Sequence, residues 1–345
     1  MRQLPGGDPF GSHRVIAPRG VLPQPARTLD NDMSRIWDNE ILLEVDTLNI
    51  DSASFAQVSE SAGGDAGRIE AAILGIVADR GKMQNPVTGS GGMFMGTVAA
   101  VGDRLADRNL KPGDRLVSLV SLSLTPLSIE EIREIRTETD QVVVNGRAIL
   151  FESGIYSPLP DDLPPALALA ALDVAGAPAQ TARLVSEGDT VVIFGATGKS
   201  GMLCACQAAK RAGRVIGFGR NPQKCQKLLE LGLCHEVVRA GATDALGCYR
   251  EVRRLTGGKM ADLVINCVNV PDTEMASILS CRDGGTVYFF SMATSFTKAA
   301  LGAEGCGRDI NMIIGNGYTR GHAELTLNVL RESHELRRLY ESLYK

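Results

Sequence analysis

The chain has 345 residues, which is room for about two domains. It is 44% hydrophobic and 22% charged, a composition typical of a globular protein and unlike that of a disordered or fibrous chain. The net charge of −4 does not favour nucleic acid or an anionic membrane surface as a partner. The opening segment mixes Arg2, His13 and Arg14 with prolines and lacks the apolar stretch of a secretory signal or a transmembrane helix. We therefore expect a cytoplasmic protein.

The first part of the chain has the pattern of a β domain. Residues 1–38 are rich in proline and predict an irregular arm that lies over this domain. Short apolar runs predict strands over 40–50, 96–102 and 114–120. A Lys-Pro-Gly-Asp turn at 111–114 precedes the last of them. This part of the chain therefore looks mainly β.

After a proline-rich stretch at 159–165 the pattern changes to alternating strands and helices. A helix is predicted from Pro222, with Asn221 as its cap and Gly232 at its end. The other predicted helices cover 166–175 and 199–212, and the predicted strands cover 190–194, 215–218, 261–265 and 286–290. This alternation predicts a parallel sheet with helices on both faces. A last helix is expected to pack on this sheet through Leu336, Leu339, Tyr340 and Leu343.

The run Gly-Ala-Thr-Gly-Lys-Ser-Gly at 195–201 lies between a predicted strand and a predicted helix. Glycines at these positions let backbone N–H groups and the helix N-terminus approach a pyrophosphate, so the run predicts dinucleotide binding. A phosphate-loop NTPase is excluded, because Ile193 stands where that motif requires a glycine.

The residues at the end of the second predicted strand indicate whether the cofactor is NAD or NADP. NAD sites usually carry an acidic residue there, but this chain has Arg220, with Lys224 one turn later. Both could hold a 2′-phosphate, so the sequence favours NADP and leaves NAD open. The predicted cofactor-binding residues are Gly195, Ala196, Thr197, Gly198, Lys199, Ser200, Gly201, Gly219, Arg220, Asn221, Lys224, Asn266, Cys267, Val268 and Ser291.

Four segments, at 39–52, 96–102, 111–114 and 195–201, together resemble the medium-chain dehydrogenase/reductase superfamily. The resemblance implies an α/β protein in which a GroES-like β domain precedes a Rossmann domain with a doubly wound parallel sheet. It also implies an active site in the cleft between the two domains. We place the substrate domain at 1–172 and the NAD(P)-binding domain at 173–345.

Longer stretches, at 80–92, 118–126, 175–180 and 289–302, resemble the family of L-erythro-3,5-diaminohexanoate dehydrogenases. This resemblance implies NAD(P)-dependent oxidative deamination of (3S,5S)-3,5-diaminohexanoate in bacterial lysine fermentation. The products would be 5-amino-3-oxohexanoate and ammonium. It also suggests a homodimer.

The sequence departs from the zinc-dependent branch of the superfamily at all three expected ligand positions. The resemblance places Asp51 at the first ligand cysteine, Gly91-Gly92-Met93 at the Gly-His-Glu motif and Asp173 at or near the third ligand. No cysteine precedes Cys204. We therefore expect no metal.

Without zinc, we expect Asp51 and Asp173 to hold the two ammonium groups of the substrate, with one of them acting as general base. The alternative is structural, with Asp51 as a turn residue and Asp173 as a helix cap or surface carboxylate. Further candidates for contacts with the substrate, including its carboxylate, are Arg80, Lys82, Ser90, Glu152, Tyr156, Thr294, Ser295 and Lys298.

Two other functions remain open from the sequence. A zinc-free NADPH-dependent quinone or enoyl reductase would share the glycine loop and would need an apolar substrate slot. A non-catalytic NAD(P)-binding redox sensor would bind the cofactor without turnover.

Overall fold

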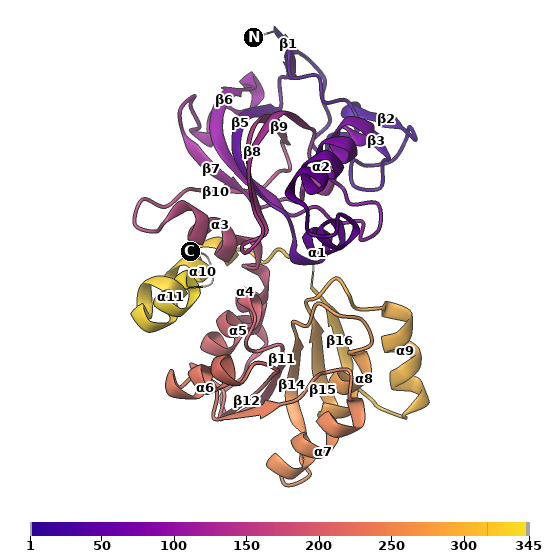
Figure 1. The fold of residues 1–345 in the computed structure, drawn as a ribbon, viewed down its shortest axis with the longest axis vertical. Coiled ribbons are helices and arrows are strands. Elements are labelled where there is room, and N and C mark those ends of the chain that lie inside the picture. The colour runs from indigo at the N-terminus through magenta and orange to yellow at the C-terminus, as the bar shows by residue number, and fades with distance from the viewer. Residues whose placement is uncertain (1, 316, 343–345) are drawn as a thin grey trace. The chain divides into compact units, whose positions relative to one another are not determined.

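The computed structural model describes residues 2–315 and 317–342, which fall into two units (Figure 1). Unit 1 runs as far as Asp173, and unit 2 spans Val174–Ser342. Among the described residues, no helix is both long enough and apolar enough to cross a membrane.

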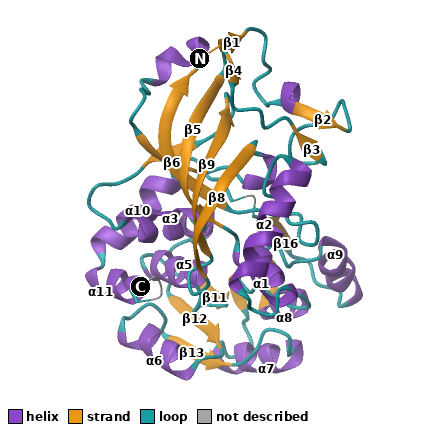
Figure 2. Ribbon diagram, turned by 45° about the horizontal axis from the view of Figure 1, so that its top comes forward, coloured by secondary structure: helices purple, strands orange, loops and turns teal. Residues whose placement is uncertain are grey.

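Unit 1 is built on a six-stranded antiparallel sheet with the order β10-β7-β6-β5-β9-β8. The strands are β5 (Glu40–Asn49), β6 (Met93–Val101), β7 (Arg115–Ser118), β8 (Leu127–Arg136), β9 (Gln141–Phe151) and β10 (Tyr156–Pro158). Figure 2 shows the long strands β5, β6, β8 and β9 curving side by side. The strands predicted from the apolar runs are therefore confirmed.

Unit 1 also contains helices that the sequence analysis missed. α1 (Ser52–Ser61) and α2 (Ala66–Arg80) follow β5, and α2 buries Ile69, Ile73 and Val77 against the core. The expectation of a mainly β domain was wrong over this stretch, although the four-residue spacing of those apolar positions is typical of a helix. α3 (Pro165–Asp173) packs on β5 and β6.

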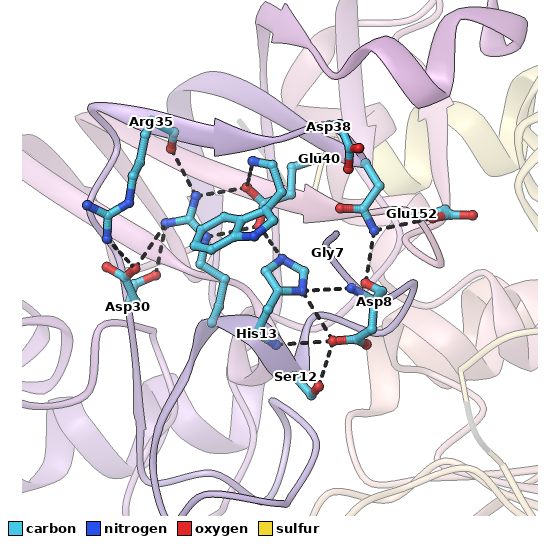
Figure 3. A network of polar contacts seen from close by, with 12 residues as sticks. Gly7, Asp8, Ser12, His13, Asp30, Arg35, Asp38, Glu40 and Glu152 are labelled. Carbon is cyan, nitrogen blue, oxygen red and sulfur yellow. Dashed lines mark hydrogen bonds and ion pairs between the residues drawn. The ribbon is translucent and has the colours of Figure 1, made fainter. Parts of the chain in front are cut away.

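The N-terminal arm is held on unit 1 by buried charges (Figure 3). Fully buried Arg14 donates to both carboxylate oxygens of fully buried Glu40, at 2.9 and 2.8 Å. His13 lies between Glu40 and Asp8, at 2.8 and 3.2 Å. The arm carries β1 (Arg2–Leu4), the 3-10 helix η1 (Ser12–Arg14), β2 (Val15–Ala17), β3 (Thr28–Leu29) and β4 (Arg35–Trp37). The predicted irregular arm is thus a fixed part of unit 1.

Unit 2 contains a six-stranded parallel sheet with the order β13-β12-β11-β14-β15-β16. The strands are β11 (Thr190–Phe194), β12 (Arg214–Gly219), β13 (Glu236–Arg239), β14 (Ala261–Asn266), β15 (Cys281–Phe289) and β16 (Asn311–Ile314). The order reverses between β11 and β14, as in a doubly wound sheet. The predicted α/β fold class is therefore confirmed.

Helices cover both faces of the unit 2 sheet (Figure 1). One side carries α4 (Gly176–Leu184), α5 (Lys199–Ala209) and α6 (Pro222–Glu230), and the other carries α7 (Ala245–Leu255), α8 (Glu274–Ser280) and α9 (Phe296–Gly305). The predicted cap of α6 is confirmed, since Asn221 accepts a hydrogen bond from the Lys224 N–H.

The C-terminal helices are α10 (His322–Glu332), which packs on α4 and α5, and α11 (His334–Glu341). Leu336 and Tyr340 are buried, Leu339 is half-buried, and Leu343 lies outside the described residues.

Candidate active site

Unit 2 has a pocket of about 270 Å³ at the carboxyl ends of β11, β12, β13 and β14. Open α/β sheets bind their ligands at this edge, where the strand order reverses. The predicted cofactor residues that line the pocket are Gly195, Thr197, Gly198, Gly219, Arg220, Cys267 and Val268.

Glycines shape the loop between β11 and α5. Gly195 has a φ of +77°, which L side chains rarely adopt. A Cβ atom on Gly201 would lie only 2.1 Å from the Gly195 carbonyl oxygen, so the loop passes directly against the first turn of α5. Gly198 caps α5 without a side chain over the helix end. Backbone N–H groups at the N-terminus of a helix can bind a phosphate, so the loop fits a dinucleotide.

Arg220 follows the end of β12 and faces the same pocket. In the part of the chain that the structure describes, its guanidinium has no hydrogen bond or ion pair. A Cβ atom built on Gly241 would lie 4.0 Å from Arg220 Cδ, so the side chain lies beside the loop after β13. An arginine without an internal partner can bind an added anion.

The other predicted cofactor residues are not in the pocket lining: Ala196, Lys199, Ser200, Gly201, Asn221, Lys224, Asn266 and Ser291. Asn266 is fully buried, donates to Thr273 Oγ1 and Ser277 Oγ at 2.9 Å each, and accepts from the Val268 N–H at 3.0 Å. It therefore holds the turn that carries Val268 rather than facing the pocket.

Part of the pocket wall was not predicted from the sequence. Residues 240–243, Asn269 and Val270 also line it. The loop at 240–243 follows β13, a four-residue strand whose ends are Glu236 and Arg239, so no apolar run marks it. The alternation of strands and helices was the available signal, because it leaves room for a further strand before β14.

Thr294, Ser295 and Lys298 lie after β15. Ser295 caps α9 by accepting from the Lys298 N–H at 3.3 Å, and its own N–H donates to Glu274 at 2.6 Å. The Lys298 side chain is paired with Asp272. Thr294 Oγ1 is buried and has no hydrogen-bond partner among the described residues, which leaves it free for a ligand.

In unit 1, Asp51 lies two residues after the end of β5 and caps α1. Its Oδ1 accepts a hydrogen bond from the Ser54 N–H at 3.0 Å. Its Oδ2 is buried and has no partner in the described chain. Asp51 is therefore a helix cap rather than the simple turn residue of the structural alternative, and one of its carboxylate oxygens has no partner among the described residues.

Gly92 packs against the backbone of Asn49 and Asp51. A Cβ atom on Gly92 would lie 2.0 Å from the Asn49 carbonyl oxygen and 2.6 Å from the Asp51 nitrogen. The preceding loop is tied to α1, because buried Asn85 donates to the Ser54 carbonyl at 3.2 Å. Ser90 lies in this loop, where its carbonyl accepts from the Asn85 N–H at 2.8 Å. Asp51 and Gly92 are thus neighbours.

Arg80 and Lys82 have partners within unit 1. Arg80 donates to the Gln84 side chain at 3.3 Å. Lys82 is fully buried and donates to the carbonyls of Pro23 and Gln24 at 2.7 and 3.0 Å. Burial, with a contribution from the charge of Arg80, lowers the pKa of Lys82 to about 8. Lys82 therefore anchors the arm.

The sheet does not bring Glu152 and Tyr156 to Asp51. Glu152 follows the end of β9 that pairs with Glu40, whereas Asp51 follows the opposite end of β5. Glu152 accepts from Asn39 and Arg104 at 3.2 and 3.3 Å and belongs to the arm network (Figure 3). Tyr156 packs on the unit 1 core.

Asp173 is the half-buried last residue of α3 and of unit 1. Over the described ranges, the structure contains no group of three or more His, Cys, Asp or Glu side chains placed to hold a metal ion.

The two units match known domain families. Residues 13–160 match the L-erythro-3,5-diaminohexanoate dehydrogenase N-terminal domain, and residues 203–314 match a domain described as zinc-binding dehydrogenase. The fold is similar to that of the CurK enoyl reductase, with a TM-score of 0.54 at 17% identity over 89% of this chain and 81% of that chain. The antiparallel sheet unit followed by the doubly wound parallel-sheet unit gives the chain the fold of a medium-chain dehydrogenase/reductase.

Two relatives narrow this class. The chain is 58% identical to the L-erythro-3,5-diaminohexanoate dehydrogenase of Acetoanaerobium sticklandii, over 98% of this chain and 99% of that protein. It is 56% identical to the enzyme of that name from Fusobacterium nucleatum subsp. nucleatum, over the same shares. The chain belongs to the L-erythro-3,5-diaminohexanoate dehydrogenase family, so it is an oxidoreductase that uses a nicotinamide cofactor and a small-molecule substrate. The family predicted from the sequence is confirmed.

Proposed function

We propose that the protein catalyses the NAD(P)-dependent oxidative deamination of (3S,5S)-3,5-diaminohexanoate to 5-amino-3-oxohexanoate and ammonium in lysine fermentation. The observation that carries this proposal is identity of 58% and 56% with two dehydrogenases of this name over 98% of the chain. The reaction consumes one water and one oxidised cofactor, and it releases ammonium, the reduced cofactor and one proton.

Unit 2 would hold the cofactor through the loop at 195–201 and Arg220, and a bound nicotinamide supplies the hydride acceptor. The free guanidinium of Arg220 in the pocket supports NADP as the preferred form, because a 2′-phosphate would give this cation a partner.

Unit 1 would supply the proton chemistry. A protonated amine must lose a proton before its nitrogen lone pair can assist hydride departure, and water must later add to the iminium carbon. Asp51 Oδ2, which is buried and unpartnered among the described atoms, can accept a proton at each of these stages. Asp173 remains the candidate for the second ammonium group.

No catalytic zinc takes part in this proposal. The resemblance aligns Gly92 with the position of a zinc-ligand histidine, but Gly92 has a φ of +96°, and a Cβ there would lie 2.0 Å from the Asn49 carbonyl oxygen. The backbone therefore leaves no room for that ligand, and the residues present do not fit the metal.

We also propose a cytoplasmic homodimer. All eight cysteines are free, which is typical of a reducing compartment. The edge strand β16 exposes Met312 and Ile314. An exposed apolar edge strand can pair with the same strand of a second copy of the chain.

The test is to mix the purified protein with 3,5-diaminohexanoate and either NAD or NADP and to follow the absorbance of the reduced nicotinamide. We expect reduction of NADP to have the higher kcat/KM. Absence of reduction with both cofactors would overturn the proposed function.

A further inference from the structure

Three buried polar atoms without a hydrogen-bond partner in the described chain belong to residues at one end of the unit 1 sheet. They are Asn49 Nδ2, Gln141 Oε1 and Asp51 Oδ2. Asn49 and Gln141 are fully buried. Nearly all buried polar groups are hydrogen-bonded, so this group of three indicates that something else binds there.

The three side chains lie on one face. Asn49 and Gln141 are directly paired across β5 and β9, so their side chains are neighbours. The strand pairing continues one residue further, because the Ile50 N–H donates to the Asp140 carbonyl at 2.9 Å. Side chains alternate along an extended chain, which places Asp51 on the same face as Asn49.

The orientation of both amides is fixed by their partners. Gln141 Nε2 donates to Asn49 Oδ1 at 3.2 Å and to the Ala166 carbonyl at 3.1 Å. A flipped Gln141 amide would turn its oxygen toward that carbonyl, so Oε1 must be the atom left free. Asn49 Oδ1 is already an acceptor, and Nδ2 must therefore be the free donor. The site offers one carboxylate acceptor, one amide acceptor and one amide donor.

A 3-amino acid presents the complementary groups. Its ammonium has three hydrogens to donate, whereas a hydroxyl has one, and its carboxylate accepts hydrogen bonds close to that ammonium. We propose that Gln141 Oε1 and Asp51 Oδ2 accept hydrogens from the 3-ammonium group of the substrate, while Asn49 Nδ2 donates to the substrate carboxylate. This inference rests on the proposed function and deepens it, because it makes Asn49 and Gln141 the residues that select a 3-amino acid over a 3-hydroxy acid.

The first test replaces the Gln141 amide in the full chain and measures steady-state kinetics with 3,5-diaminohexanoate. Loss of one acceptor for a charged group should raise KM about tenfold or more in Gln141→Leu, with a smaller change in kcat. In the same variant, the ratio of kcat/KM for the 3-amino substrate to kcat/KM for its 3-hydroxy analogue should also fall.

Asn39→Leu is the matched control. Asn39 is also fully buried, also has an unpartnered Oδ1 within the described chain, and lies at the other end of β5. It donates to the Asp8 carbonyl at 3.0 Å and to Glu152 at 3.2 Å. Both variants should lower Tm, but only Gln141→Leu should change KM. Equal losses of Tm with unchanged KM in both would mean that the three atoms bind structural water, and would overturn the proposal.

The second variant keeps the shape of the site. Asn49→Asp retains the acceptor for Gln141 but replaces the free donor with an oxygen, which should repel the substrate carboxylate. Calorimetric titration of the cofactor-free protein with 3-aminobutanoate should show binding to the wild type and its loss in Asn49→Asp, whereas 1,3-diaminobutane should bind both. Unaltered binding of 3-aminobutanoate to Asn49→Asp would overturn the proposal. Failure of the wild type to reduce either cofactor would instead overturn the proposed function, because this titration does not need turnover.

Discussion

Asp51 combines two roles at the scale of the single residue. One carboxylate oxygen caps α1 and the other is buried without a partner among the described residues. The sequence set a structural turn role against a catalytic role for Asp51, but the two oxygens of one carboxylate can serve a helix cap and a substrate. The position of Asp51 was predictable from its place in the family pattern. That only one of its two carboxylate oxygens is hydrogen-bonded was not predictable, because the bond from the Ser54 N–H depends on the geometry of the turn between β5 and α1.

Asp51→Asn should lower kcat about a hundredfold or more, because it removes the proposed general base while keeping a cap for α1. Steady-state kinetics with 3,5-diaminohexanoate measure the effect. Asp65→Asn is the control, since Asp65 caps α2 through the Arg68 N–H at 2.9 Å and lies outside the proposed site. A wild-type kcat in Asp51→Asn would exclude Asp51 as the base.

Arg220→Ala should raise KM for NADP about tenfold or more, because it would remove the proposed charge-assisted bond to the 2′-phosphate. KM for NAD should change little, since NAD lacks that phosphate. Equal effects on the two cofactors would argue that Arg220 only shapes the pocket wall.

The carboxylate of Asp8 makes the stability of the N-terminal arm depend on pH. Burial raises the pKa of Asp8, but hydrogen bonds from the side chains of Ser12 and His13 and from the N–H groups of Phe10 and His13 outweigh it and lower that pKa to about 2. Because this value lies below the ordinary 3.8, Asp8 stabilises the fold above pH of about 4, and its contribution is lost as the pH falls toward 2.

The free energy of unfolding, measured by denaturant titration between pH 5 and pH 2, should therefore fall less steeply in Asp8→Asn than in the wild type. Glu138→Gln, at an exposed position, serves as control. A slope that is the same in Asp8→Asn and the wild type would contradict this account.

At the scale of the element, apolar runs predicted the strands well. β11 begins and ends at the predicted residues, because Val191, Val192 and Ile193 form a fully buried run. α1 was missed because small and polar residues dominate it and because its cap, Asp51, was interpreted as a substrate-binding residue. The pocket loop at 240–243 was missed with β13, whose residues are only half-buried or exposed. Elements with little burial leave weak patterns in a sequence.

The edge strand β16 carries the proposed dimer contact. Ile314 is 60% exposed on this strand, and an exposed apolar edge favours pairing with another chain. Ile314→Lys should shift the protein from dimer to monomer in light scattering coupled to gel filtration. Leu246→Lys, on α7, replaces a leucine that is 61% exposed away from that edge and should leave the dimer intact. Equal molar masses for Ile314→Lys and the wild type would place the contact elsewhere.

At the scale of the whole molecule, the division into a β unit and a parallel-sheet unit was predictable, because hydrophobic periodicity changes after residue 165. The attachment of the N-terminal arm to the rest of unit 1 was not predictable. Its anchors are long-range pairs such as Arg14 with Glu40 and Lys82 with the Pro23 carbonyl, and a proline-rich sequence does not reveal such partners.

Removal of residues 2–38 should unfold unit 1, because Glu40 would be left buried without its cation. Unit 2 should still bind NADP, since its pocket is built from its own residues. Calorimetry should then show one remaining transition that NADP shifts to higher temperature. A truncated protein that keeps full turnover would contradict this dependence on the arm.

The glycine at position 92 also limits how the fold can be altered. Any side chain at this position would meet the β5 backbone, because its Cβ atom would lie 2.0 Å from the Asn49 carbonyl oxygen. A substitution at position 92 alone therefore cannot introduce a metal ligand there. Engineers who wish to convert this scaffold into an alcohol dehydrogenase would have to rebuild the segment from Asn49 to Asp51 before choosing any ligand.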